Sequence, residues 1–180
     1  DKTGRLYASV NPNGLNLGKV SISIRHYGRG SVAIPTTKND TKLMARYVDF
    51  QSSLLNEFAK DVSLRIYYLN DELNEYKTAT NLPNLTINDF NIVHYDGIRE
   101  DCGFENNDNF VEGESYVIYK NVIGNQIAKD FFYLQFDVNE FSENGATAND
   151  FTEITFSGKE TENQTVQLNW QSKYEIKAEK

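Results

Sequence analysis

Three segments of this chain alternate strictly between apolar and polar residues. A period of two places alternate side chains on opposite faces of a β-strand, so each segment is predicted to be a half-buried strand. The apolar faces are Val20, Ile22 and Ile24 in the first segment, Val62, Leu64, Ile66 and Tyr68 in the second, and Phe132, Leu134, Phe136 and Val138 in the third.

Weaker strand patterns lie between these segments, and turn-forming sequences separate them. The weaker strands are expected at 5–10, 31–35, 45–50, 90–95 and 115–122. Asn, Gly and Pro predict turns at 11–14, 27–30, 81–84 and 123–126. Many short strands joined by turns favour a sandwich or a barrel. We predict an all-β, immunoglobulin-like antiparallel β-sandwich.

Two stretches depart from the strand pattern. The sequence LNDELNEYKTA, residues 69–79, consists of helix formers and predicts a short helix of two to three turns, with Asn70 or Asp71 as its N-cap. In residues 52–62, apolar side chains at helical spacing suggest either one helical turn or a packed loop before the strand at 61–69.

Composition excludes several classes of function. The net charge of −8 and the pI of about 4.8 argue against nucleic acids and anionic membrane surfaces, which need clustered Lys and Arg. The sequence contains no run of 18 apolar residues that would predict a membrane span, and residues 1–10 contain no signal-peptide core. We therefore expect a mature or internal segment. The single Cys102 cannot form an internal disulfide.

The last thirty residues read as a hairpin. A polar, Gly-containing stretch at 143–151 predicts a boundary between a β-sandwich module at 1–145 and a partial second sandwich, or a linker to a sorting domain, at 151–180. A strand with Ile154 and Phe156 is followed by one that ends at Trp170, as in the opening hairpin of a fibronectin type III-like sandwich. Because an indole needs a covering sheet, we expect the chain to be a fragment of a longer protein.

The sequence resembles the C-terminal region of large secreted and cell-surface proteins of Bacteroidota, substrates of the type IX secretion system. The hairpin matches a recurring pattern through Phe156, Lys159, Asn163, Leu168, Trp170 and Glu175. A strand–helix module that precedes it is matched by Val62, Leu64, Arg65, Ile66, Tyr67, Tyr68, Glu72 and Leu73. The stretch FYLQFDVNEFSE, 132–143, is similar to the strand that closes this module, and the match covers roughly residues 40–175.

This resemblance implies a non-catalytic module of an adhesin or gliding-type surface protein, located outside the cell. Its partner would be the outer-membrane export machinery, engaged through a downstream sorting domain, and surface glycans are a further candidate. The family usually has a Leu-Pro-Val-like linker where this chain has Thr152, Glu153 and Ile154, and the sorting domain itself is not in this sequence. The alternative is a carbohydrate-binding accessory domain of a secreted hydrolase.

No residue is assigned a catalytic, cofactor-binding or metal-binding role. The hydrolase, zinc-protease and nucleotide-binding motifs are absent from the sequence, so we do not predict an enzyme. The acidic loop at 94–114 suits a solvated surface, with calcium as the alternative, although its spacing is not that of an EF-hand. Six tyrosines are candidates for an exposed sheet face that stacks on sugars or, more commonly, packs across strands: Tyr7, Tyr27, Tyr67, Tyr95, Tyr119 and Tyr133.

Overall fold

The computed structural model describes residues 5–33, 42–54, 57–96, 115–119, 121–148, 154–160 and 166–172. The chain divides into two compact units, residues 1–148 and 149–180. The first unit extends three residues beyond the predicted end of the sandwich module. Neither helix in the described part of the chain has the length and apolar character needed to cross a bilayer.

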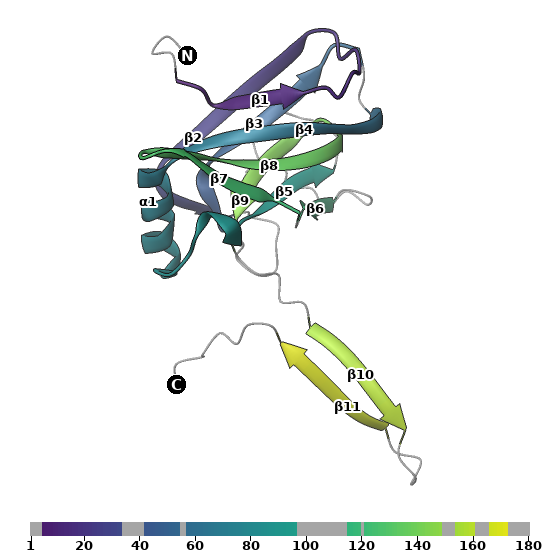
Figure 1. Ribbon diagram of the computed structural model, residues 1–180. Coiled ribbons are helices and arrows are strands. Elements are labelled where there is room, and N and C mark those ends of the chain that lie inside the picture. Colours follow the sequence, from purple (N-terminus) through teal and green to yellow (C-terminus); the bar gives the residue numbers. More distant parts are fainter. Residues whose placement is uncertain are drawn as a thin grey trace. The chain divides into compact units, whose positions relative to one another are not determined.

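Two antiparallel sheets form the first unit (Figure 1). The four-stranded sheet has the order β1–β4–β8–β7, with β1 at Ala8–Asn11, β4 at Glu57–Leu69, β8 at Phe131–Glu140 and β7 at Ile123–Ala128. The five-stranded sheet has the order β2–β3–β9–β5–β6, with β2 at Val20–Ala33, β3 at Lys42–Ser52, β9 at Glu143–Thr147, β5 at Asn91–Asp96 and β6 at Ser115–Tyr119.

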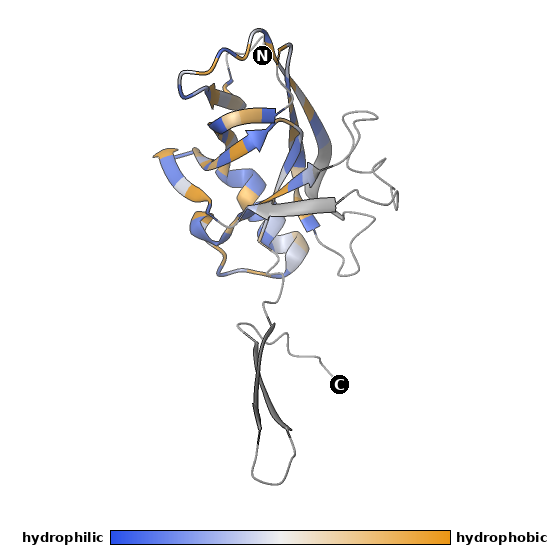
Figure 2. Cartoon of the chain, turned by 90° about the vertical axis from the view of Figure 1, so that its right-hand side faces the viewer, coloured by the Kyte–Doolittle hydropathy of each residue, from blue (hydrophilic) through white to orange (hydrophobic). Residues whose placement is uncertain are grey.

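The core lies between these sheets, which makes the unit a sandwich. The even-numbered residues of β4 and β8 meet those of β3 and β5, and Val62, Leu64, Ile66, Val48 and Ile92 are all 0% exposed. Figure 2 shows the corresponding alternation of hydrophilic and hydrophobic residues along the coloured strands. The prediction of an all-β, immunoglobulin-like antiparallel sandwich with one short helix is confirmed.

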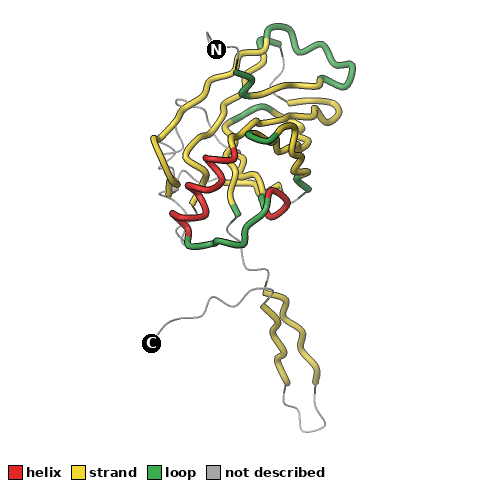
Figure 3. Tube along the Cα trace, turned by 60° about the vertical axis from the view of Figure 1, so that its left-hand side comes forward, coloured by secondary structure: helices red, strands yellow, loops and turns green. Residues whose placement is uncertain are grey.

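The helix α1, Asn70–Thr80, follows β4 directly, and the short 3-10 helix η1, Ile87–Asp89, precedes β5 (Figure 3). Leu73 and Tyr76 face the core from α1. The predicted N-cap is wrong by one or two residues, because Leu69 occupies that position and its N–H donates to Glu72 Oε2 at 2.7 Å. A carboxylate three residues into the helix thus replaces the expected cap side chain.

Three other local predictions are wrong. Residues 57–62 are neither a helical turn nor a loop, because β4 begins at Glu57 and shifts register between Glu57 and Val62. The predicted turn at 27–30 lies inside β2, whose pairing with β3 shifts between His26 and Ser31. The predicted turn at 123–126 is part of β7. In both predicted turns, Gly sits in a strand at an irregular edge rather than in a reversal of the chain.

The division between the two units, after Ala148, falls inside the predicted boundary stretch 143–151, but the first half of that stretch is not a linker. Residues Glu143–Thr147 form β9, a central strand of the five-stranded sheet that is buried at every position. Small and polar residues suit this strand because it is enclosed: a Cβ on Gly145 would lie 2.7 Å from Leu43 Cδ1.

The second unit contains the predicted hairpin. Strands β10, Ile154–Glu160, and β11, Val166–Ser172, pair antiparallel, and Phe156 is the register partner of Trp170. The side chains of this hairpin lie outside the described part of the structure, so its membership of a fibronectin type III-like sandwich stays a prediction.

Candidate functional site

A buried arginine lies on the inner face of the five-stranded sheet. Arg46 on β3 is 3% exposed, and its Nη2 donates to the backbone oxygen of Tyr67 and, at 3.1 Å, to Glu72 Oε2. Its guanidinium carbon lies 5.1 Å from the ring centre of Tyr7 and 4.7 Å from that of Tyr68. These contacts offset the cost of removing a cation from water.

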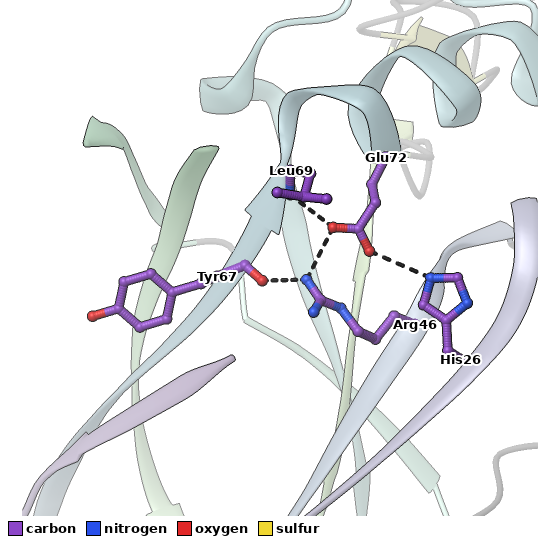
Figure 4. A network of polar contacts seen from close by, with 5 residues as sticks. All are labelled: His26, Arg46, Tyr67, Leu69 and Glu72. Carbon is purple, nitrogen blue, oxygen red and sulfur yellow. Dashed lines mark hydrogen bonds and ion pairs between the residues drawn. The ribbon is translucent and has the colours of Figure 1, made fainter. Parts of the chain in front are cut away.

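The partner carboxylate, Glu72, connects three elements of the fold (Figure 4). Its Oε2 accepts hydrogen bonds from the Leu69 N–H at the start of α1 and from Arg46 on β3. Its Oε1 lies 3.6 Å from His26 Nε2 on β2. A negative charge in the first turn is also favoured by the helix dipole. This network therefore ties the start of α1 to two strands, and we interpret it as structural.

Tyr68 lies against the same arginine in the core. Burial raises the pKa of Tyr68 above its ordinary value, and the nearby positive charge of Arg46 offsets this only in part. The phenol is therefore neutral at physiological pH, and the raised pKa is the opposite of what a tyrosinate nucleophile would require.

The two histidines of the chain occupy separate environments. His26 lies beside Glu72, whereas His94 is 0% exposed on β5, with Nδ1 2.9 Å from Asn144 Oδ1 and Nε2 3.7 Å from Glu140 Oε1. Asn144 in turn donates to the Ser142 backbone oxygen at 2.7 Å, which orients its amide. The His94 ring also packs edge-on against Tyr119. We interpret His94 as a core histidine.

The outer face of the four-stranded sheet has a different character, because its residues are polar and, apart from the buried Tyr67, at least partly exposed. Register places Ser9, Arg65 and Gln135 in one row across β1, β4 and β8. The adjacent row pairs Tyr67 with Tyr133, and the row on the other side pairs Ser63 with Asp137. Arg65 and Gln135 are 70 positions apart in the sequence, so only the fold brings them together.

Specific contacts order this face. Arg65 Nε donates to Gln135 Oε1 at 2.8 Å, and its guanidinium carbon lies 4.6 Å from the ring centre of Tyr133. Tyr133 also accepts from Asn125 Nδ2 at 2.9 Å and packs edge-on against Tyr67. The Tyr67 hydroxyl lies 3.2 Å from Ser9 Oγ. The guanidinium is thus held in one orientation on an exposed surface.

A depression of about 240 Å³ opens beside this arginine. It is lined by Ser9, Val10, Asn11, Ser63, Arg65 and Gln135. This set contributes two hydroxyls, two carboxamides and a guanidinium, which together donate and accept hydrogen bonds but contain no nucleophile–base pair. These groups suit the binding of a polar ligand through hydrogen bonds.

The tyrosines predicted to form an exposed face do not all reach one. Tyr67 and Tyr95 are 7% and 2% exposed, so neither lies on an exposed face. The alternative, packing across strands, is confirmed for Tyr67, which packs edge-on against its register partner Tyr133. Tyr7, Tyr119 and Tyr133 are half-buried, and Tyr119 packs on His94 and Phe136 rather than facing solvent. The side chain of Tyr27 lies outside the described residues.

The predicted acidic loop and Cys102 cannot be assessed in the same way. A solvated loop is wrong for residues 94–96, which end β5 with His94 and Tyr95 buried, and residues 97–114, with Cys102, fall outside the described ranges. Within those ranges, no three His, Cys, Asp or Glu side chains come together as a metal site. Calcium binding at 94–114 stays a prediction.

The residues of the outer face were visible in the sequence only as the polar half of an alternating pattern. Ser63, Arg65 and Gln135 were expected on the solvent side of their strands, and they lie there. Comparison with family models, curated proteins and solved structures found no match for this chain.

Proposed function

We propose that this chain is a non-catalytic β-sandwich module of a large bacterial cell-surface or secreted protein, an adhesin or gliding-type surface protein exported by the type IX secretion system. What carries this proposal is the resemblance of the strand–helix stretch from Val62 to Leu73 to the module that often precedes the hairpin segment near the C-termini of such proteins. The module would act as a spacer, and its position would be extracellular.

The structural roles of the matching residues support a scaffold function. Val62, Leu64, Ile66 and Tyr68 supply the inner face of β4, and Glu72 fastens α1 to β3. In the closing stretch, Phe141 packs on Phe50 and Phe58, and Ser142 and Glu143 are buried. A motif whose residues build the core is expected to be retained for folding and not for chemistry.

The experiment is an export assay in the source organism. The intact native protein would be identified by mass and sequence, and then located by immunodetection in wild-type cells and in cells lacking the type IX export machinery. We expect surface or medium localisation that is lost in the deletion strain, with a continuation past Lys180 into further strands. Unchanged localisation in the deletion strain would exclude the proposal.

The non-catalytic part of the proposal has a separate test. Purified protein that includes these residues is assayed against peptide and polysaccharide substrates, beside a version from which residues 1–148 are deleted. We expect the same activity, or the same lack of it, from both. A hydrolytic activity that disappears with residues 1–148 would exclude a spacer role.

A further inference from the structure

We propose that the outer face of the four-stranded sheet is a saccharide-binding site centred on Arg65, which recognises the hydroxyl groups of a pyranose ring in the depression between β1, β4 and β8. This inference goes beyond the proposed function, because it does not depend on how the protein is exported. It is carried by the ordered polar side chains around the depression, which no structural role of the sandwich requires.

The first argument is the orientation of the guanidinium. Gln135 engages Arg65 Nε, and the Tyr133 ring lies beneath the guanidinium plane, so the side chain is immobilised without an acidic partner. An exposed arginine normally loses conformational entropy about several rotatable bonds when it binds a ligand. Here that entropy has already been lost on folding. The terminal Nη groups of Arg65 then present a planar pair of donors, whose spacing suits two adjacent ring hydroxyls.

The second argument is the composition of the wall. Ser9, Ser63 and Asn11 surround the depression with groups that donate and accept, and Asp137 lies opposite Ser63 on the neighbouring strand as an acceptor. A sugar hydroxyl also both donates and accepts hydrogen bonds, so these side chains can serve it as acceptors or as donors. A purely anionic ligand would find no use for the acceptor Asp137, and the chain's net charge of −8 disfavours its approach.

The third argument concerns the support behind the site. Tyr133 is held by a hydrogen bond from Asn125 and by edge-on packing against the Tyr67 ring. The hydroxyl of Tyr67 in turn contacts Ser9 Oγ. The face is thus a connected network over a rigid antiparallel sheet, and binding residues on strands hold their geometry better than residues on loops. The aromatic rings support the arginine instead of forming the row of exposed rings expected for a sugar-stacking face.

The test uses the whole 180-residue chain on a glycan array, followed by calorimetry on each polysaccharide that binds. The panel contains neutral polymers and uronate-containing polymers, so that recognition of hydroxyls is separated from recognition of carboxylates. We expect binding to at least one polymer that persists when the salt concentration is raised, because hydrogen bonds to hydroxyls are screened far less than charge attraction. If no polymer binds, the proposal is wrong.

Variants assign the binding to this face. Arg65→Ala and Gln135→Ala are each expected to weaken the affinity roughly tenfold, the loss that follows from removing a hydrogen-bonding partner at such a site. Arg65→Lys keeps the charge but not the planar fork, and is expected to bind as weakly as Arg65→Ala. Lys129→Ala, at an exposed position in the β7–β8 turn, removes the same charge away from the depression and should bind like the wild type.

Two outcomes would overturn the proposal even if binding occurs. One is full affinity in Arg65→Ala and Gln135→Ala, which would place the ligand elsewhere. The other is binding restricted to acidic polymers, abolished by salt and retained in Arg65→Lys, which would indicate general charge attraction. Thermal unfolding of every variant is measured alongside, and because Arg65 and Gln135 are outside the core, the variants should stay folded.

Discussion

In the four-stranded sheet burial alternates along β8 and, in β4, from Val62 to Ile66, whereas in the five-stranded sheet β3 is buried at every position from Leu43 to Phe50, and β9 from Glu143 to Thr147. The first sheet therefore has one face for the core and one for solvent. At β3 and β9 the second sheet is buried on both faces, with Tyr47, Asp49 and Glu143 buried on the side that faces away from the core, whereas the edge strand β2 is mostly exposed from Val20 to His26. A binding surface is accordingly available on the four-stranded sheet.

Exchanging a large side chain for alanine on the two outer faces gives the most direct test of this difference. Tyr47→Ala is expected to lower the free energy of unfolding by about 3–5 kcal/mol, because it empties a fully enclosed site. Tyr133→Ala, at a half-buried position, should cost about 1 kcal/mol. Urea denaturation measures both, and equal losses would contradict the contrast between the sheets.

Two arginines sharpen the same comparison. Arg46→Ala leaves Glu72 without its cationic partner near the core, and should cost about 3 kcal/mol. Arg65→Ala, on the exposed face, should stay within about 0.5 kcal/mol of the wild type. The double variant Arg46→Ala with Glu72→Gln is expected to recover part of the loss, and strictly additive losses would argue against the Arg46–Glu72 interaction.

A glycine on the enclosed strand provides a test by overpacking. Gly145→Ala places a methyl group 2.7 Å from Leu43 Cδ1, so the leucine must move within a filled space, at a cost of about 1–3 kcal/mol. The matched change Ser63→Ala on the outer face of β4 should alter stability by less than about 0.5 kcal/mol. Thermal unfolding of the pair is the measurement, and a neutral Gly145→Ala would mean that the five-stranded sheet is loosely packed.

The smallest expected effect is a pH dependence from Tyr68. Because burial raises its folded-state pKa above the ordinary tyrosine value of 10.0, the unfolded chain releases this proton first as the pH rises. Stability from this group is complete below pH 10 and falls by about 1.4 kcal/mol per pH unit above it. Tyr68→Phe removes this contribution, so the wild type should lose stability more steeply in alkali. Parallel curves would show that Tyr68 ionises normally.

The same contrast explains which parts of the fold could be predicted from the sequence. Strands β4 and β8 were predicted with the correct inward residues, because one buried face leaves a period of two in the sequence. Strand β9 was taken for a linker, because Glu143, Asn144 and Gly145 carry no such period when both faces are enclosed. Its burial depends on neighbours that are distant in sequence, such as Lys42, whose backbone oxygen accepts from Thr147 at a separation of 105 residues.

The candidate site was predictable only in part. The outward direction of Ser63, Arg65 and Gln135 follows from the pattern of their own strands. The pairing of Arg65 with Gln135, and the position of Tyr133 beneath the guanidinium, depend on the register between β4 and β8. Register is set by packing across the whole sheet, and a shift of one residue would direct every side chain to the other face.

The position of β9 has a consequence for how the protein is made. It is the last strand of the first unit to be synthesised, yet it separates β3 from β5 in the middle of its sheet. Until the chain has been synthesised as far as Thr147, β3 and β5 both lack β9, the strand that pairs with each of them in the folded sheet. Since domains fold as units, the sandwich must assemble after translation of its whole length rather than strand by strand. The five-stranded sheet therefore cannot be completed until the last strand of the unit has been made.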